Sequence, residues 1–170
     1  MRLLTKLFGG TASREPSGSF RLRGAAWSVS PTSDLPPFLR ALPRLLPPGS
    51  TIYLEDGTPP SEVKAFLDAH CVPEGLIVAA GTIWPRPAVY HLPATAENLA
   101  QLAGLAEHCL AVHVAVHFHA YVRDKVVLEW YDAFWKDPLY LSESIAEERV
   151  KDFCSLLSLT YKNLKETSSS

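Results

Sequence analysis

The stretch from Cys109 to Trp135 constrains the fold more than any other part of the chain. Its first half alternates between a purely apolar set of positions and a set that includes three histidines, and its second half is rich in β-branched and aromatic residues. Successive side chains on a strand point to opposite faces, and residues of these kinds favour strands. The pattern therefore predicts two long strands joined by a tight, charged turn at Arg123, Asp124 and Lys125.

The two faces of this predicted hairpin differ in character. The even-numbered face is almost wholly apolar, whereas the odd-numbered face gathers histidine, tyrosine and glutamate. A three-residue loop keeps the apolar positions together, and a two-residue loop would shift the pairing by one and place His117 near Asp132 instead. Because a one-residue slip moves a strand's side chains to the other face, burial of the apolar face favours the first register. That register pairs Val122 with Val126, Tyr121 with Val127, His119 with Glu129, Phe118 with Trp130 and His117 with Tyr131.

The remaining pattern of the chain predicts a single α+β domain. Segments with strand and helix character follow in the order strand, helix, strand, helix, two strands, helix, two strands, helix. We expect a mixed, mostly antiparallel sheet with helices mainly on one face, built around the long central hairpin of residues 109–135. Residues 9–19 are small and polar, so we expect residues 1–19 to form a flexible N-terminal segment, residues 20–161 the domain and residues 162–170 a disordered tail.

Composition and charge narrow the classes of partner. With 170 residues and 47% hydrophobic residues the chain can bury a core unaided, and its formal net charge of −2 lacks the basic surface that nucleic acid requires. The three cysteines, Cys71, Cys109 and Cys154, form no C-x-x-C pair and indicate a reducing compartment. The apolar run near the N-terminus is too short for a signal peptide or a membrane span. We expect a soluble, cytoplasmic protein that binds neither membrane nor nucleic acid.

The odd-numbered hairpin face is the main candidate for function. Tyrosine and tryptophan are enriched at protein interfaces because they combine a large contact area with a polar group. A sheet face of this kind could dock a protein partner or a second copy of the chain, unless a helix or the N-terminal segment covers it. Trp84 and Pro85 add a further aromatic and proline surface. The predicted binding face comprises His113, His117, His119, Tyr121, Glu129, Tyr131 and Trp135.

A metal site is the alternative interpretation of the same residues. His117 and His119 are two positions apart on one strand face, which puts their Cβ atoms roughly 6.5–7 Å apart. Two imidazoles at this spacing could share a zinc ion, with Glu129 as third ligand in the favoured register or Asp132 in the other. An H-x-H pattern also occurs on polar sheet faces that bind no metal, and we favour that interpretation.

Other signals for catalysis are weak. Glu55 and Asp56 lie at the end of a predicted strand, where sites often lie in α/β sheets, but a role as turn residues before a helix explains them better. The sequence holds no phosphate-binding loop, dinucleotide fingerprint, zinc-protease helix or hydrolase elbow.

We therefore predict a non-enzymatic binding or interaction protein of regulatory, accessory or inhibitor type, which requires no cofactor. The alternative is a zinc-type hydrolase that uses His117, His119 and Glu129. A third hypothesis is a pH-responsive surface, because clustered histidines titrate near neutrality.

Overall fold

A seven-stranded sheet organises the computed structural model, which describes residue 22 and residues 24–55, 57–73 and 88–165. Within these residues every pair of neighbouring strands is antiparallel, in the order β3-β2-β4-β5-β6-β1-β7. The strands are β1 (Ala25–Val29), β2 (Thr51–Glu55), β3 (Val89–Pro93), β4 (His117–Val122), β5 (Lys125–Trp130), β6 (Leu139–Ser142) and β7 (Tyr161–Asn163). The helices are α1 (Leu35–Leu45), α2 (Ser61–His70), α3 (Ala96–Leu105), α4 (Ala111–Val114) and α5 (Glu147–Leu157).

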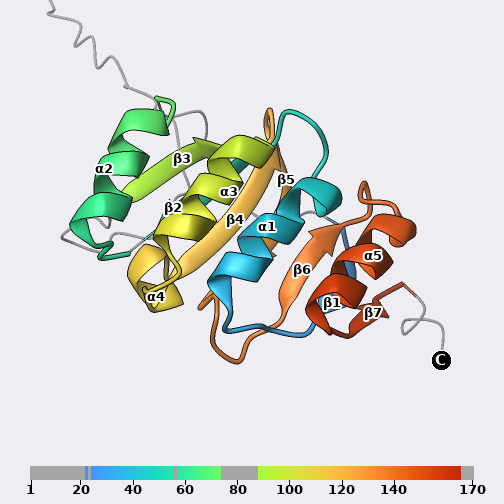
Figure 1. Cartoon of the computed structure of the whole chain (residues 1–170). Helices are drawn as coiled ribbons and strands as arrows, with labels where there is room; N and C mark the ends of the chain where they lie inside the picture. The colour runs from blue at the N-terminus through green and yellow to red at the C-terminus, as the bar shows by residue number, and fades with distance from the viewer. Residues whose placement is uncertain (1–21, 23, 56, 74–87, 166–170) are drawn as a thin grey trace, which may run out of the picture.

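The helices α1, α3 and α5 lie across one face of the sheet, and α1 occupies the middle (Figure 1). This confirms the predicted α+β class and the packing of helices against the sheet. Phe38 of α1 is fully buried at the centre of the core between the two layers. Its ring centroid lies 5.3–5.8 Å from the ring centroids of Phe118, Trp130, Phe134 and Phe153. Aromatic burial of this extent supplies much of the free energy that holds such layers together.

The predicted first strand of the hairpin is wrong at its beginning. Residues Ala111–Val114 form the short helix α4, and the strand β4 begins only at His117. Ala111 and Val114 are buried while Val112 and His113 are exposed, so burial here follows the helical spacing of three rather than the alternation of a strand. Gly57 packs against the end of this helix, where an added Cβ would lie 2.3 Å from the carbonyl oxygen of Val114.

The predicted second strand is wrong at its end. Strand β5 ends at Trp130, and residues 131–136 form a run of turns that we call the 131–136 loop. Asp132 and Phe134 have positive φ angles of 44° and 67°, which no strand residue adopts. The change of backbone direction at Phe134 points its ring into the core, where the ring centroid lies 4.6 Å from that of Trp130. The aromatic composition that predicts a strand here instead supplies core contacts from a loop.

The hairpin register combines features of both loop lengths. Val122 pairs with Lys125 across a two-residue turn, in which Arg123 has a φ angle of 57°. A bulge between Ala120 and Tyr121 then restores the register, so that His119 pairs with Glu129 and Phe118 with Trp130, as predicted. Next to the turn, Tyr121 pairs with Val126 rather than Val127, and Val122 does not pair with Val126.

The C-terminal boundary lies later than predicted. Tyr161–Asn163 forms strand β7 and pairs with β1, so the ordered fold includes residues assigned to the tail. The predicted flexible segment of residues 1–19 lies outside the described residues, as do residues 166–170. Among the helices that the structure describes, none has the length and apolar character that crossing a membrane demands. Cys71, Cys109 and Cys154 are free thiols.

Candidate functional site

The face of the sheet opposite α1, α3 and α5, here called the outer face, carries the odd-numbered residues of β4. Phe118 packs on Phe38 of α1, so His119, its neighbour in the strand, points to the other side. Directly paired residues of antiparallel strands share a face, which places Tyr53 and Glu129 beside His119 on the outer face. His91 pairs with Tyr53 and extends the same row to the edge strand β3.

Polar side chains on one half of the outer face are buried. Tyr53, Glu55, His91, His119 and Tyr121, here called the buried polar cluster, are each at most 5% exposed. The Tyr53 hydroxyl donates to a carboxylate oxygen of Glu55 at 2.7 Å, and His91 Nδ1 lies 2.9 Å from the Tyr121 hydroxyl. Burial of a polar group is costly without such partners, so these contacts make the cluster tolerable inside the fold. Burial, with the Glu55 carboxylate as a further cause, raises the pKa of Tyr53.

Two histidines of β4 accept hydrogen bonds from the main chain of the facing segment. Nδ1 of His119 lies 3.4 Å from the amide nitrogen of Trp130, and Nδ1 of His117 lies 3.1 Å from that of Asp132. An accepting Nδ1 carries no proton, so both rings hold their proton on the other nitrogen when neutral. Burial, and then the nearby His117, lowers the pKa of His119 to about 3. His119 is therefore a neutral core residue at physiological pH.

The seven residues of the predicted binding face do not form one open surface. His119 and Tyr121 are buried, and His113 lies on α4 rather than on the strand. Trp135 lies in the 131–136 loop and is 67% exposed, so its assignment to a strand face is wrong. Tyr131 is exposed and packs against the two strand histidines, with ring centroids 5.5 Å from that of His117 and 4.8 Å from that of His119. Glu129 is half-buried.

The residues proposed as zinc ligands are engaged in other contacts. Glu129 accepts a hydrogen bond from the amide of Leu22 at 2.6 Å, and the Nδ1 atoms of both His117 and His119 are occupied as acceptors. Within the residues that the structure describes, no group of three or more His, Cys, Asp or Glu side chains is arranged to hold a metal ion. The carboxylate of Glu55 belongs to the buried polar cluster, whereas Asp56 and the Trp84-Pro85 segment lie outside the described residues.

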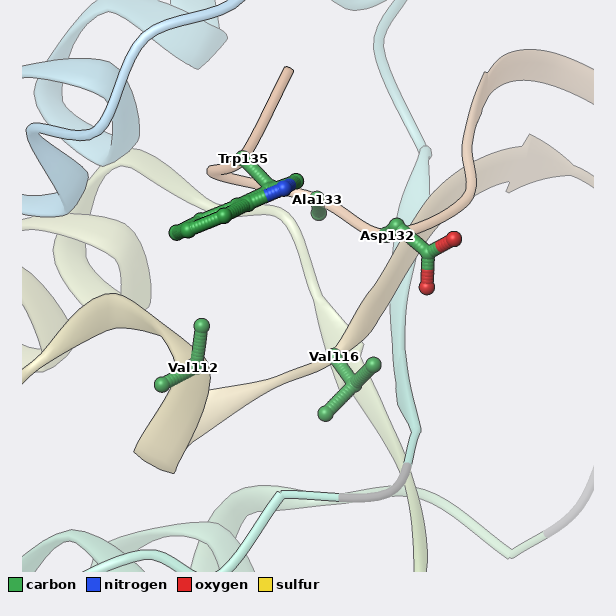
Figure 2. Close-up of a pocket in the computed structure, with 5 residues that line it drawn as sticks. All are labelled: Val112, Val116, Asp132, Ala133 and Trp135. Carbon is green, nitrogen blue, oxygen red and sulfur yellow. The ribbon is translucent and has the colours of Figure 1, made fainter. Parts of the chain in front are cut away.

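An open pocket of about 360 Å³ lies beside this region, between α4 and the 131–136 loop (Figure 2). Figure 2 shows the Trp135 indole on one side, Val112 and Val116 on the other, and the Asp132 carboxylate at one end. Val112 is 40% exposed, and Leu110, which precedes α4, is 65% exposed. We call Val112, Val116 and Trp135 the Trp135 patch. It joins exposed or half-buried apolar side chains from two segments that adjoin each other in space but not in sequence.

Trp135 lies on the 131–136 loop, which hydrogen bonds hold against the rest of the fold. Asp132 donates its amide to His117, Ala133 donates its amide to the carbonyl of Val116 at 2.7 Å, and the Trp130 indole donates to the carbonyl of Asp137 at 2.8 Å. Positive φ angles at Asp132 and Phe134 cost about 1–2 kcal/mol each. Strained backbone that persists this way is typical of functional segments, because the surrounding contacts must compensate for it.

The sequence analysis missed the patch because it assigned Val112 and Val116 to the buried face of a long strand. The signal that could have revealed it is the spacing of Ala111 and Val114, which permits a helical turn whose other residues face solvent. Comparison with protein-family models, curated protein sequences and solved structures finds no match. The function is therefore inferred from the geometry of the chain itself.

Proposed function

We propose that this chain is a non-enzymatic binding protein, of regulatory, accessory or inhibitor type, that recognises another protein through the Trp135 patch. The observation that carries the proposal is the exposure of Trp135, at 67% the largest among the exposed large hydrophobic side chains of the described residues. An exposed tryptophan beside further apolar side chains is a frequent centre of protein interfaces, where tryptophan contributes disproportionately to affinity. The anchored loop supports this role because it reduces the entropy lost when a partner binds.

A different protein fits the patch better than a second copy of the chain. A stable dimer interface buries about 800 Å² on each partner and involves about 20–30 residues a side. The pocket is lined by five residues, far fewer than such an interface involves. The patch is also concave, so it requires a projecting side chain on its partner. A second copy could bind here only with further contacts outside the patch.

The test compares wild type with Trp135→Ser and with a matched control, Leu156→Ser. Leu156 is 52% exposed on α5, which lies on the other side of α1 from α4 (Figure 1). Each purified form is used to capture proteins from a lysate of the source cells. A protein retained by wild type and the control is then purified and its Kd measured against all three forms. We expect Trp135→Ser to raise the Kd by about 30-fold or more, and the control to change it by less than about twofold.

Two outcomes would overturn the proposal. One is a partner whose Kd does not respond to Trp135→Ser, and the other is a wild type that captures nothing beyond what the variant captures. Sedimentation of the three forms provides a further arm. A dimer that Trp135→Ser disperses would assign the patch to a second copy of the chain.

Elemental analysis decides between this proposal and the zinc hydrolase. Near-stoichiometric zinc in untagged wild type, lost in a His117→Ala, His119→Ala double variant, would replace the binding proposal. We expect no such metal, because His119 is fully buried and Glu129 already accepts from the Leu22 amide.

A further inference from the structure

The pocket in the Trp135 patch combines three kinds of surface that one common side chain can satisfy together. Val112, Val116 and Ala133 form apolar walls, Trp135 contributes an aromatic ring, and Asp132 is the one charged group among the five lining residues. An apolar wall suits a methylene stem, while a carboxylate and an indole both attract a cation. We infer that the pocket binds a lysine or arginine side chain that projects from the protein partner. This inference rests on the proposed function, since it names the chemistry of the partner that the patch takes.

The arrangement in Figure 2 fits a side chain that enters along its length. The indole of Trp135 lies on one side of the pocket and the two valines on the other, and Asp132 stands at one end with its carboxylate turned away from the indole. A methylene stem could therefore lie between the apolar walls with its charged end toward Asp132. Lysine and arginine are the side chains that join such a stem to a cation.

A cation on this indole is a contact that the chain makes already. Lys136 Nζ lies 5.6 Å from the centroid of the Trp135 ring, within the range of a cation–π interaction. Trp135 is one of the five residues that line the pocket, and Lys136 is not. Cation–π attraction is strongest for tryptophan among the aromatic residues, and it strengthens where water is displaced.

Competing occupants fit the pocket less well. An aliphatic side chain would satisfy the valines and the indole, but it would remove water from the Asp132 carboxylate without replacing it, which is unfavourable. An acidic side chain would meet the same carboxylate and be repelled. The charge of Asp132 therefore selects the partner, while the apolar walls supply contact area.

The test uses three short capped peptides that differ at one central position: arginine, citrulline or norleucine. Citrulline keeps the length of arginine without its charge, and norleucine keeps the stem alone. The probe is the indole N–H resonance of Trp135 in ¹⁵N-labelled full-length protein, assigned with Trp135→Phe. We expect the arginine peptide to shift this resonance, and the citrulline and norleucine peptides to bind about three- to tenfold more weakly.

Asp132→Asn provides the matched test of charge. Asparagine tolerates the positive φ angle of this position, so the variant should keep the loop intact. We expect it to bind the arginine peptide more weakly, so that its preference for arginine over citrulline falls to the part that the Trp135 indole supplies. Asp124→Asn removes an exposed carboxylate in the hairpin turn and should preserve the discrimination of the wild type.

Equal shifts with all three peptides, no shift with any of them, or discrimination that Asp132→Asn leaves undiminished would each overturn the inference. None of these results decides the proposed function, which depends on how partner binding responds to Trp135→Ser. A partner lost with Trp135→Ser but insensitive to Asp132→Asn would show that the patch docks a neutral side chain, and the proposed function would stand.

Discussion

The buried polar cluster and the Trp135 patch depart from the usual distribution of side chains in opposite directions. In the cluster, His119, Glu55 and their neighbours are buried, although such side chains are mostly exposed in folded proteins. In the patch, Trp135 is 67% exposed, although tryptophan is highly buried on average. The two regions adjoin, because Tyr131 packs on His119 and the next residue, Asp132, lines the pocket.

The difference between them separates structural residues from binding residues. In the buried polar cluster, the Tyr53 hydroxyl donates to Glu55, and Nδ1 of His119 accepts from the main chain, so these atoms have partners inside the fold. In the patch, exposed side chains gain little from folding, and nothing in folding alone requires Trp135 to be there. In this protein the buried histidine His119 therefore has a structural role, and the exposed loop residue Trp135 is the better candidate for binding. Variants that change stability should map to the cluster, and variants that change binding should map to the patch.

Among variants of the buried polar cluster, the largest effect should come from His119→Ala. The substitution removes a fully buried ring that contacts Tyr53 and Tyr131 and accepts from the Trp130 amide, and we expect a loss of about 2–5 kcal/mol in the free energy of unfolding. His113→Ala is the matched control at an exposed position of α4. It should change the free energy of unfolding by less than about 0.5 kcal/mol. Urea denaturation measures both, and equal losses would break the assignment of His119 to the core.

Tyr53→Phe should have the next largest effect. It keeps the ring but removes the hydroxyl that donates to the buried carboxylate of Glu55, which should cost about 1–3 kcal/mol. Tyr140→Phe makes the same chemical change at an exposed position on the outer face and should cost less than about 0.5 kcal/mol. If the two variants denature at the same urea concentration, the hydrogen bond to Glu55 contributes nothing net to stability.

Acid should destabilise the native state through His119. Its pKa of about 3 in the folded protein lies below the ordinary value of about 6.5, so the unfolded chain binds a proton that the native state does not. The contribution of neutral His119 to stability is complete above about pH 6.5 and is lost as the pH falls toward 3.

Between pH 6 and pH 5 the loss from His119 should be about 1 kcal/mol. His119→Asn can still accept from the Trp130 amide but does not titrate, so its stability should fall by about that much less over the same interval. Urea denaturation of both proteins at the two pH values measures the difference. Parallel losses would show that other groups carry the acid sensitivity.

Much of the fold was predictable because burial of one apolar face fixes the central strand pairs. Phe118 and Trp130 both require the core, and placing them opposite each other also places His119 opposite Glu129. The bulge that reconciles this register with a two-residue turn leaves no local signal in the sequence. Pairing with β2 brings Tyr53 beside His119, and that contact joins segments more than sixty residues apart. Local patterns therefore revealed the histidines but not the tyrosine and carboxylate that bury with them.

The candidate site was less predictable, because β propensity misassigned both ends of the hairpin. Alternation over residues 111–116 fits a strand, but it also fits one helical turn followed by extended residues. The close packing of Gly57 on α4 is a tertiary contact, so the local pattern does not reveal it. Beyond Trp130, aromatic residues favour a strand by composition, yet Phe134 reaches the core only through a positive φ angle. Tertiary contacts outweighed local propensity at both places, and the pocket lies between them.

The smallest effect on stability should come from Trp135→Ser. That small effect would separate the Trp135 patch most clearly from the buried polar cluster. Trp135 is 67% exposed, so its removal should change the free energy of unfolding by less than about 0.5 kcal/mol. Its neighbour Phe134 is buried against Phe38 and Trp130, so Phe134→Ser should cost about 3–5 kcal/mol. Urea denaturation compares the two adjacent positions directly. If Trp135→Ser proves as damaging as Phe134→Ser, the indole supports the fold, and its exposure no longer points to a partner.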